Sequence, residues 1–567
     1  MKKNGSNRQT RWRGKSILIT LILVCVSYYF VLPPLNLHST ELIRFLIGCL
    51  LVYILIALLC AAKEMQRSDE EEDADQAPPS ARLGGYVSFA KKYCKPVLAV
   101  VLVAIAIFLV GQVISLPLFR ANAYHNLLPV ETGDFSTDVE QLPYSEIPML
   151  DESSAQRLGD RKLGELSDMV SQFKIAEEYT QINVQDRPVR VACLEYGDIF
   201  KWVINCRQGL PAYVKVDMVS QEVEIVRMES LGQTGIRYSP SEYLVRDLNR
   251  TLRFRYPTYL FSPPHLEVDE EGTPWWVCPR ETRTIGLYGG TDILGAVLLN
   301  ASTGESQYYT MEEIPAWVDQ VYQASLITEQ YDYYGKYGNG FLNSIIGQQG
   351  VTVTTSGVNY LAMEDDVYMY TGITSINSDQ SNIGFLLSNQ RTKETVYYAA
   401  PGAIETSAQN SAEGVVQDLG YTATFPLLLN IGGEPTYFMS LKDSADLVKM
   451  YAMVNVGQYQ LVTTGTTVTE CETNYIALLS RNGIVTEDVE ALAIENTTVS
   501  GTIAEIRTAV LEGTTYYYLR LEEGPQFYSL PATQDPSVIL RNVGDQVSLQ
   551  TKGSADENGI QEILSLE

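Results

Sequence analysis

GEPTYFMSLKD, residues Gly433–Asp443, has two relatives in the same chain, GLPAYVKVD from Gly209 and GTPWWVCPR from Gly272. All three begin with glycine, any residue, proline, any residue, aromatic. Glycine adopts positive φ freely, whereas proline fixes φ and lacks a backbone donor, so the pair suits a turn that enters a strand. The runs before the copies also read as strands: KWVINC (201–206), HLEVD (265–269) and FPLLLNI (425–431). The repeat therefore predicts three corners of similar structure.

A second repeat has the form Asp/Asn-x-x-Ser/Thr-x-Glu. Its copies are DMVSQE (217–222), NASTGE (300–305) and NQRTKE (389–394), each between two apolar or aromatic runs. Asp or Asn at a turn accepts hydrogen bonds from backbone two residues on, and Ser or Thr does so more weakly. The repeat predicts three hairpins of one type, and the irregular spacing of the copies disfavours a solenoid.

Helices are expected between these hairpins. Apolar spacing and capping residues predict them near 160–178, from Ser239 in the capping box SPSE, from Pro315, near 404–419 and near 444–453. The predicted pattern alternates helices with antiparallel hairpins.

A helix followed by strands with a hairpin such as VLLNASTGESQYY resembles the PepSY module, an extracytoplasmic α+β unit of peptidase propeptides and envelope regulators. The resemblance covers residues 160–465 in two or three divergent copies. It implies a binding or regulatory role and supplies no catalytic residues. We assign PepSY-like repeats to residues 154–330 and a further α+β repeat region to 331–497.

Three apolar runs precede this region. They lie at 16–32, 45–62 and 97–119 and contain no charged residue, and each is about long enough to cross a bilayer as a helix. We therefore predict a cytoplasmic tail at 1–15, three transmembrane helices within 16–119, an acidic cytoplasmic loop at 63–96 and a polar linker at 120–153. Small residues at Gly48 and Gly111 would allow partner helices to approach closely.

Charge indicates the orientation and excludes one class of partner. Basic residues before the first run and between the second and third place both flanks in the cytoplasm, and the body after Phe119 outside. Residues 1–118 have 13 Lys and Arg against 8 Asp and Glu, whereas the remainder has 28 against 60. Nucleic acid binding needs clusters of basic residues, so nucleic acid is excluded as a partner of the acidic body.

The final segment reads differently. Residues 498–567 contain five short strand-like runs with turn signals between them, which predict a small barrel of the OB type. The segment has 4 basic and 10 acidic side chains, so a protein-binding or capping role is favoured over binding of single-stranded nucleic acid.

The cysteines do not indicate a metal site. Cys193, Cys206, Cys278 and Cys471 are far apart in the outer region, no CxxC pair occurs, and His125 and His265 are the only histidines after Phe119. No metal or cofactor is expected. A disulfide between Cys193 and Cys206 is allowed by the compartment, although the predicted hairpin would not place them opposite each other.

Two groups of residues are candidate ligand contacts. The first is the aromatic stretch YDYYGKYGNGF, whose tyrosines either stack on sugar rings or fill a core: Tyr331, Tyr333, Tyr334 and Tyr337. The second is the acidic run Glu364, Asp365 and Asp366, which either binds a cation, acts as an acid and base, or forms an exposed turn.

No motif supports catalysis. The chain lacks GxSxG, a P-loop, GxGxxG and HExxH, so we predict no catalytic residues. The predicted function is a plasma-membrane protein that binds or regulates another envelope protein or a wall polymer. The alternative is a wall-active hydrolase that uses carboxylates such as Glu364, Asp365 or Asp366. A transporter is disfavoured because the apolar runs contain no ionisable acid or base.

Overall fold

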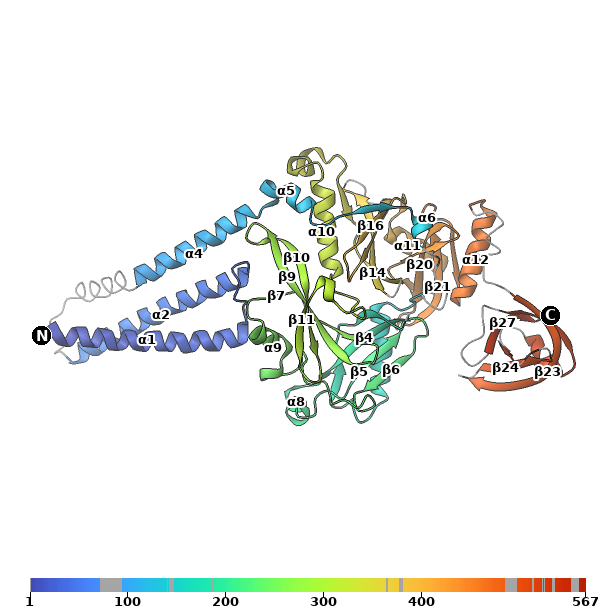
Figure 1. Ribbon diagram of the computed structural model, residues 1–567, viewed down its shortest axis with the longest axis horizontal. Helices are drawn as coiled ribbons and strands as arrows, with labels where there is room; N and C mark the ends of the chain where they lie inside the picture. Colours follow the sequence, from blue (N-terminus) through green and yellow to red (C-terminus); the bar gives the residue numbers. More distant parts are fainter. Residues whose placement is uncertain are drawn as a thin grey trace. The chain divides into compact units, whose positions relative to one another are not determined.

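The computed structural model describes residues 2–71, 94–139, 141, 147–185, 187–363, 366–376, 381–484, 497–511, 514–522, 524, 526–532, 536–551 and 560–566. The chain forms two compact units. One consists of Met1–Asn430 and Pro435–Val462, and the other of Ile431–Glu434 and Thr463–Glu567. The fold is a mixture of helices and antiparallel sheets with a barrel at the carboxyl end (Figure 1).

Three long helices begin the chain. They are α1 (Lys2–Val31), α2 (Thr40–Glu71) and α4 (Lys95–Ile114), and α2 packs against both of the others. Among the described residues, two stretches are long and apolar enough to cross a membrane, Thr40–Leu59 and Lys95–Ile114, whereas the apolar part of α1 is only Ser16–Val31. The prediction of three full-length spans therefore does not hold for α1. Polar residues occupy the first half of α1, and Pro33 and Pro34 follow its end.

Short helices connect these long helices to the sheets and accompany each sheet. Their bounds are α5 (Pro117–His125), α6 (Phe135–Asp138), α7 (Glu152–Gly164), α8 (Ile199–Asn205), α9 (Leu248–Arg255), α10 (Ala324–Tyr337), α11 (Glu405–Val415) and α12 (Val468–Arg481). Single turns occur at η3 (Leu244–Arg246), η4 (Met311–Glu313), η5 (Asn343–Gly347) and η7 (Pro536–Leu540).

Four sheets follow one another along the chain, and we number them I to IV. Sheet I contains β2 (Phe173–Ile175), β3 (Thr180–Val184), β4 (Arg187–Tyr196), β5 (Ala212–Asp217) and β6 (Val223–Arg227). Sheet II contains β7 (Leu260–Phe261), β8 (His265–Val268), β9 (Pro274–Ile285), β10 (Gly289–Asn300) and β11 (Ser306–Thr310). Sheet III contains β12 (Thr352–Thr354), β13 (Asn359–Met363), β14 (Asp366–Ser375), β15 (Ser381–Asn389), β16 (Thr395–Tyr398), β17 (Gly402–Ala403) and β1 (Glu131–Gly133). Sheet IV contains β18 (Thr422–Ala423), β19 (Leu427–Ile431), β20 (Glu434–Lys442), β21 (Val448–Asn455) and β22 (Val462–Gly465).

The four sheets repeat one plan. In each, a helix is followed by two short strands that both pair with the same third strand, and the fourth and fifth strands then extend the sheet. The helices in these positions are α7, α9, α10 and α11. Sheet III adds β1, which pairs with β16 in the parallel direction, and β17. The expected alternation of helix and hairpin is therefore present, in four copies.

The Asp/Asn-x-x-Ser/Thr-x-Glu repeat forms the turn between the fourth and fifth strands of sheets I, II and III. In every copy the first side chain accepts hydrogen bonds from the backbone N–H groups two and three residues later. The Ser or Thr hydroxyl accepts the N–H of the final Glu. The fifth residue has positive φ in all three copies, at Gln221, Gly304 and Lys393. The prediction of three hairpins of one type is confirmed.

The glycines of the Gly-x-Pro-x-aromatic repeat behave alike, but the elements before them do not. Gly209, Gly272 and Gly433 have φ of 84°, 78° and 85°. The second and third copies lie between two paired strands, as expected. Before the first copy, however, KWVINC belongs to α8 and not to a strand. Asp198 accepts the N–H groups of Phe200 and Lys201 and so starts a helix there.

Several predicted helices are misplaced. The helix expected at 160–178 is α7 and ends at Gly164, and the helix expected from Ser239 begins only after Asp247, whose side chain accepts the N–H of Arg250. No helix starts at Pro315. The helix expected near 444–453 is strand β21, because pairing with β20 overrides its helical spacing. The helix expected near 404–419 is confirmed as α11.

Two buried apolar clusters hold the first three sheets together. One joins sheets I and II through side chains such as Leu194, Tyr213 and Leu299. The other joins sheets II and III with α10 through side chains such as Leu298, Ile327 and Met369. Sheet II therefore contributes to both clusters, through Leu299 in the first and Leu298 in the second.

The carboxyl-terminal barrel has five strands. They are β23 (Thr497–Leu511), β24 (Thr514–Leu521), β25 (Phe527–Pro531), β26 (Gln546–Thr551) and β27 (Ile560–Leu566). They close in the order β23, β24, β25, β27, β26, and the pair β25 and β27 is parallel. Its core includes Ile503, Leu519, Leu530 and Leu549. The prediction of five strands from residue 498 is confirmed.

Candidate functional site

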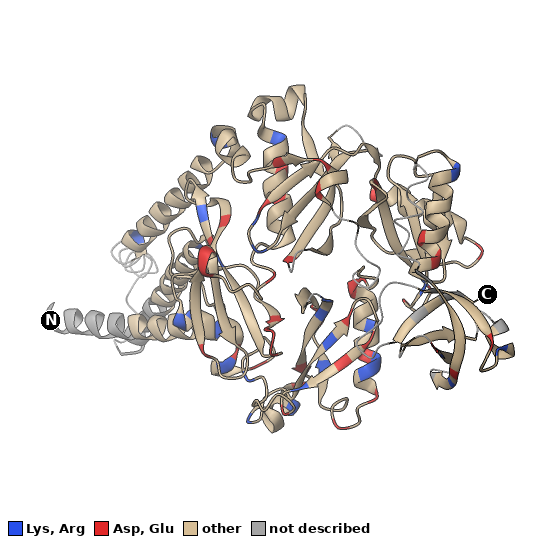
Figure 2. Ribbon diagram, turned by 45° about the vertical axis from the view of Figure 1, so that its right-hand side comes forward, with Lys and Arg blue, Asp and Glu red and all other residues tan. Residues whose placement is uncertain are grey.

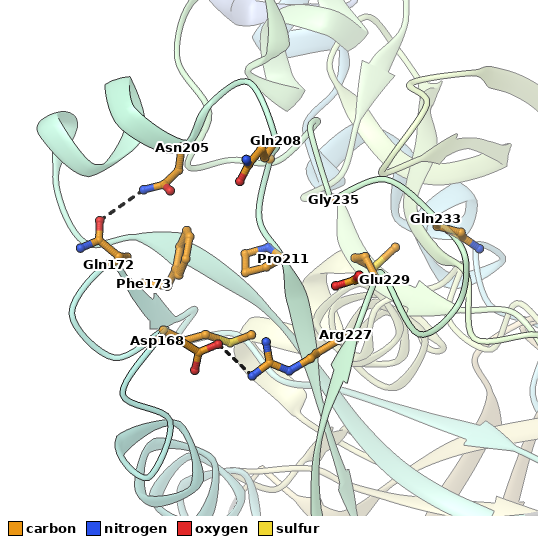
Figure 3. Close-up of a pocket in the computed structure, with 13 residues that line it drawn as sticks. Asp168, Gln172, Phe173, Asn205, Gln208, Pro211, Arg227, Glu229, Gln233 and Gly235 are labelled. Atoms are coloured by element: carbon orange, nitrogen blue, oxygen red, sulfur yellow. Dashed lines mark hydrogen bonds and ion pairs between the residues drawn. The ribbon is translucent and has the colours of Figure 1, made fainter.

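An open pocket of about 360 Å³ lies beside sheet I. Its lining comes from three segments: the α7–β2 connection (Asp168, Met169, Gln172 and Phe173), the end of α8 with the following turn (Asn205, Gln208, Gly209 and Pro211), and the end of β6 with the following loop (Arg227, Met228, Glu229, Gln233 and Gly235). Figure 3 shows these side chains. The volume is at the lower end of the range for small-molecule sites.

Two glycines allow the walls of the pocket to meet. A Cβ on Gly209 would lie 2.5 Å from the carbonyl oxygen of Ile236, and a Cβ on Gly235 would lie 2.5 Å from that of Gln208. The close approach permits a backbone bridge between Leu210 and Ile236. Only glycine fits both positions without displacing backbone. The Gly-x-Pro-x-aromatic corner therefore forms one wall of the pocket.

Polar side chains stand on either side of an apolar floor. Asp168 Oδ2 accepts a hydrogen bond from Arg227 Nη2 at 3.0 Å, and Gln172 Oε1 accepts one from Asn205 Nδ2 at 3.3 Å. The Phe173 ring lies between these two pairs in Figure 3. Met169 and Met228 also line the pocket and are buried. The pocket thus combines planar hydrogen-bonding groups with one ring.

The lining consists mainly of amide, charged and apolar side chains. None of the described lining residues is His, Cys, Ser or Lys, so the pocket lacks the usual pairing of a nucleophile with a base. Its acids are Asp168, which is paired with Arg227, and Glu229. Amides, a guanidinium and carboxylates can hydrogen-bond to hydroxyl and amide groups of a ligand, and an aromatic ring can contact its apolar face.

The tyrosines of the aromatic stretch have two kinds of surroundings: Tyr333, Tyr334 and Tyr337 contact α5, whereas Tyr331 lies in the cluster that joins sheets II and III. Tyr331 is buried, and the Tyr333 ring meets that of Tyr124 at 4.7 Å between centroids. His125 stacks on Tyr334 at 4.6 Å, and its Nδ1 is 2.7 Å from the carbonyl oxygen of Tyr334. Burial raises the pKa of Tyr331 and Tyr333. These contacts correspond to the packing alternative for the stretch.

The structure describes one member of the predicted acidic run. Asp366 begins β14 and is buried, and its carboxylate receives two hydrogen bonds of 2.7 Å from Arg391 and one of 2.7 Å from Asn389. It therefore fixes the hairpin turn of sheet III and is not a free acid. Glu364 and Asp365 lie outside the described residues.

The histidine and cysteine positions agree with structural roles. His265 Nε2 lies 2.9 Å from Glu267 Oε1, and Glu267 also accepts the N–H groups of Asp319 and Gln320. Cys193 and Cys206 are both free, so the disulfide considered above is not formed. Burial raises the pKa of the Cys193 thiol.

The β9–β10 hairpin joins the body to the long helices. Ser115 Oγ, at the end of α4, accepts the N–H groups of Leu287 and Tyr288, both at 3.0 Å. The ring of Tyr288 fills the space beside Gly111, where a Cβ would lie 2.5 Å from it. The space beside Gly111 is therefore filled by this chain's own Tyr288, whereas nothing lies within 4 Å of a Cβ on Gly48.

Sequence reasoning missed the pocket. Its residues come from segments that span 68 positions, and only Gly209 and Pro211 belong to a motif that we recognised. The repeat pointed to a corner in the fold, but the loop that brings Gly235 against it has no sequence signal of its own.

Comparisons with known proteins supply no family. No protein-family model matches the chain, and no curated protein matches it. Among solved structures, one described as an exo-beta-1,3-galactanase from Bifidobacterium bifidum s17 aligns with 53% of this chain and 74% of its own at 8% identity and a TM-score of 0.17. This likeness is too low to carry an argument about fold or activity.

Proposed function

We propose that this chain is a membrane-anchored envelope protein whose extracytoplasmic body binds a cell-wall polymer or another envelope protein without catalysing a reaction. The pocket beside sheet I is the proposed binding site, and a wall polymer is the ligand that it favours.

The exposure of the apolar helices carries the membrane part of this proposal. In the 18-residue apolar part of each of the two stretches, Thr40–Leu59 and Lys95–Ile114, only 11% of the residues are buried. The core helix of a soluble protein would be mostly buried, because exposed apolar surface is unfavourable in water. Lipid is the environment in which such helices are stable.

The placement of α1 and the charge pattern support an outside location for the body. The α1–α2 loop and the end of α4 both contact the β9–β10 hairpin at Leu287. His38 Nδ1 in the loop lies 2.8 Å from the carbonyl oxygen of Leu287, and the N–H of Leu287 donates to Ser115 Oγ at the end of α4. These helix ends lie against the body. On this proposal α1 also crosses the membrane beside α2, although its apolar part is shorter. The basic flanks at the opposite ends favour the cytoplasm.

The pocket supports a polymer ligand. Sugars and short peptides present many hydroxyl or amide groups, which match the Asp168–Arg227 and Gln172–Asn205 pairs and the ring of Phe173. An open pocket also accepts an internal part of a chain, whereas an enclosed one accepts only a small molecule.

The repeated plan supports the PepSY-like interpretation, and the barrel supports the OB-like one. A helix followed by an antiparallel sheet occurs four times, and the barrel has five strands with β25 and β27 parallel. On this proposal the sheets form the binding body and the barrel is a module for protein contact.

Binding to cells without walls tests both site and location. Protoplasts that display the full-length protein are mixed with fluorescent fragments of wall polymer, alongside purified protein in detergent. Binding is expected in both preparations, and the double variant D168A/R227A should bind the fragments with at least tenfold lower affinity. The matched control is K215A/E224A, which removes an ion pair of 2.9 Å on the same sheet outside the pocket.

Each outcome has one meaning. Binding by the purified protein but not by protoplasts would contradict the outside location. Equal binding by both double variants would contradict the pocket as the site. Release of soluble fragments from intact polymer would instead favour the carboxylate hydrolase.

A further inference from the structure

We propose that α8, η3 and α9 form a membrane-seated surface that lies in the lipid headgroup region and prefers anionic lipid. We call this surface the α8–α9 platform. The inference rests on the proposed membrane anchoring and adds to it a second, peripheral contact between the body and the bilayer.

The platform exposes large apolar side chains on adjacent short segments. They are Phe200 (74% exposed), Val203 (60%) and Ile204 (72%) from α8, Leu244 (59%) and Val245 (74%) from η3, and Phe254 (55%) from α9. Single exposed apolar residues are ordinary, but six on neighbouring segments are not. Such a group marks a surface that is covered in the functional state.

Side-chain contacts join these segments into one surface. The Trp202 ring lies 4.9 Å from that of Tyr243, and Trp202 Nε1 donates to Glu242 at 2.8 Å. Arg246 Nη1 donates to the carbonyl oxygen of Cys206 at 2.7 Å, which links η3 to the end of α8. Arg250 of α9 donates a hydrogen bond to the carbonyl oxygen of Leu244 in η3, so contacts link all three segments.

The platform begins where α1 ends. Arg250 lies over the Tyr29 ring at 4.3 Å and donates to its carbonyl oxygen, and the Phe254 ring lies 6.3 Å from those of both Tyr28 and Tyr29. Tyrosines at the end of an apolar helix favour the membrane–water interface. Contact with these tyrosines places α9 at the level of the membrane–water interface. Figure 1 shows α9 beside the end of α1.

Charge selects lipid over other partners. Residues 198–207 and 237–255 together contain seven Lys or Arg and three Asp or Glu, whereas the chain after residue 118 has about twice as many acids as bases. One of the three acids, Glu242, is buried, and its carboxylate accepts hydrogen bonds from Tyr196 and Trp202. Blue Lys and Arg segments lie next to the described ends of the long helices in Figure 2. A basic, apolar surface at the headgroup level matches anionic lipid.

Photocrosslinking of the full-length protein tests the platform. A benzophenone amino acid replaces Phe200 or Val245, and the protein is reconstituted alone into vesicles of phosphatidylcholine with or without phosphatidylglycerol. The matched control is Val415, which is 51% exposed at the end of α11. Mass spectrometry should detect several-fold more lipid adduct at residues 200 and 245 than at 415, with an increase when phosphatidylglycerol is present.

A fourth position separates this inference from the membrane anchoring. The benzophenone at Leu102 in α4, which is 58% exposed, should form lipid adducts whenever the helices span the bilayer. Suppose that position 102 forms lipid adducts but positions 200 and 245 form no more than the control at 415. This result would overturn the platform and leave the membrane anchoring intact. No adduct at 102 would overturn both proposals. Protein–protein adducts at 200 or 245 would contradict lipid as the partner of the platform and identify a second copy of the chain in its place.

Discussion

At the scale of single residues, the protein depends on glycines at positions where side chains are not tolerated. Gly209 has positive φ and also meets the backbone of Ile236, so two separate constraints act on it. Gly232, in the loop after β6, has φ of 68° but nothing within 4 Å of its Cβ position. The two positions therefore differ in surroundings and share a conformation.

Alanine at these two glycines should separate strain from crowding. G232A should lower the free energy of unfolding by about 1–2 kcal/mol, the usual cost of left-handed backbone for a residue with a Cβ. G209A should cost more, because the methyl group also displaces the backbone at Ile236. Thermal unfolding followed by circular dichroism measures both. Equal losses would mean that the contact with Ile236 relaxes without cost.

At the scale of elements, the repeated turn shows how a short pattern specifies a hairpin. Asp217 Oδ1 accepts the N–H groups of Val219 at 2.9 Å and Ser220 at 2.7 Å, and Asn300 and Asn389 do the same in their sheets. An amide oxygen thus substitutes for a carboxylate oxygen within one chain. The turn requires an acceptor at this position and not a charge.

Substitution of Asp217 tests this requirement. D217A removes the acceptor of two backbone N–H groups and should lower the free energy of unfolding by about 1–2 kcal/mol. D217N keeps the acceptor and should cost less than about 0.5 kcal/mol. Both variants lose the ion pair with Arg187, which is 3.6 Å long and exposed on the arginine side. Similar losses in the two variants, measured by urea unfolding, would show that charge matters more than the turn.

At the scale of the molecule, residues far apart in sequence join sheet IV to the start of sheet I. Lys442 Nζ in β20 donates to Asp151 Oδ2 at 2.7 Å, and Asp151 also caps α7 through the N–H of Ser154. Burial alone raises the pKa of Asp151, but hydrogen bonds from Lys442, Ser154 and Ser153 outweigh burial and hold the pKa below its ordinary value.

This contact should make stability depend on pH. Because the folded-state pKa of Asp151 is lowered, its contribution is present above the unfolded pKa of about 3.9 and is lost as pH falls through the folded value. D151N retains a capping oxygen but no charge, so it should be less stable than the original protein by about 1 kcal/mol at pH 7. The difference should shrink below about pH 4. If the difference in stability between D151N and the original protein did not change with pH, the loss would be due to the altered helix cap and not to the charge.

The sequence by itself determined the features whose causes are local. The Asp217, Asn300 and Asn389 turns were predictable because each is built from hydrogen bonds within a few residues. The barrel strands and the two apolar stretches in α2 and α4 were predictable because length and alternation suffice to identify them.

Only the tertiary structure decided the rest. Strand β21 pairs with β20 in place of forming a helix, α8 replaces an expected strand, and α10 directs Tyr333 and Tyr334 onto α5. The pocket beside sheet I exists because Gly209 and Gly235, 26 positions apart, meet across a backbone bridge. Contacts between distant segments outweigh local preference, and one segment's sequence does not specify which other segment it will meet.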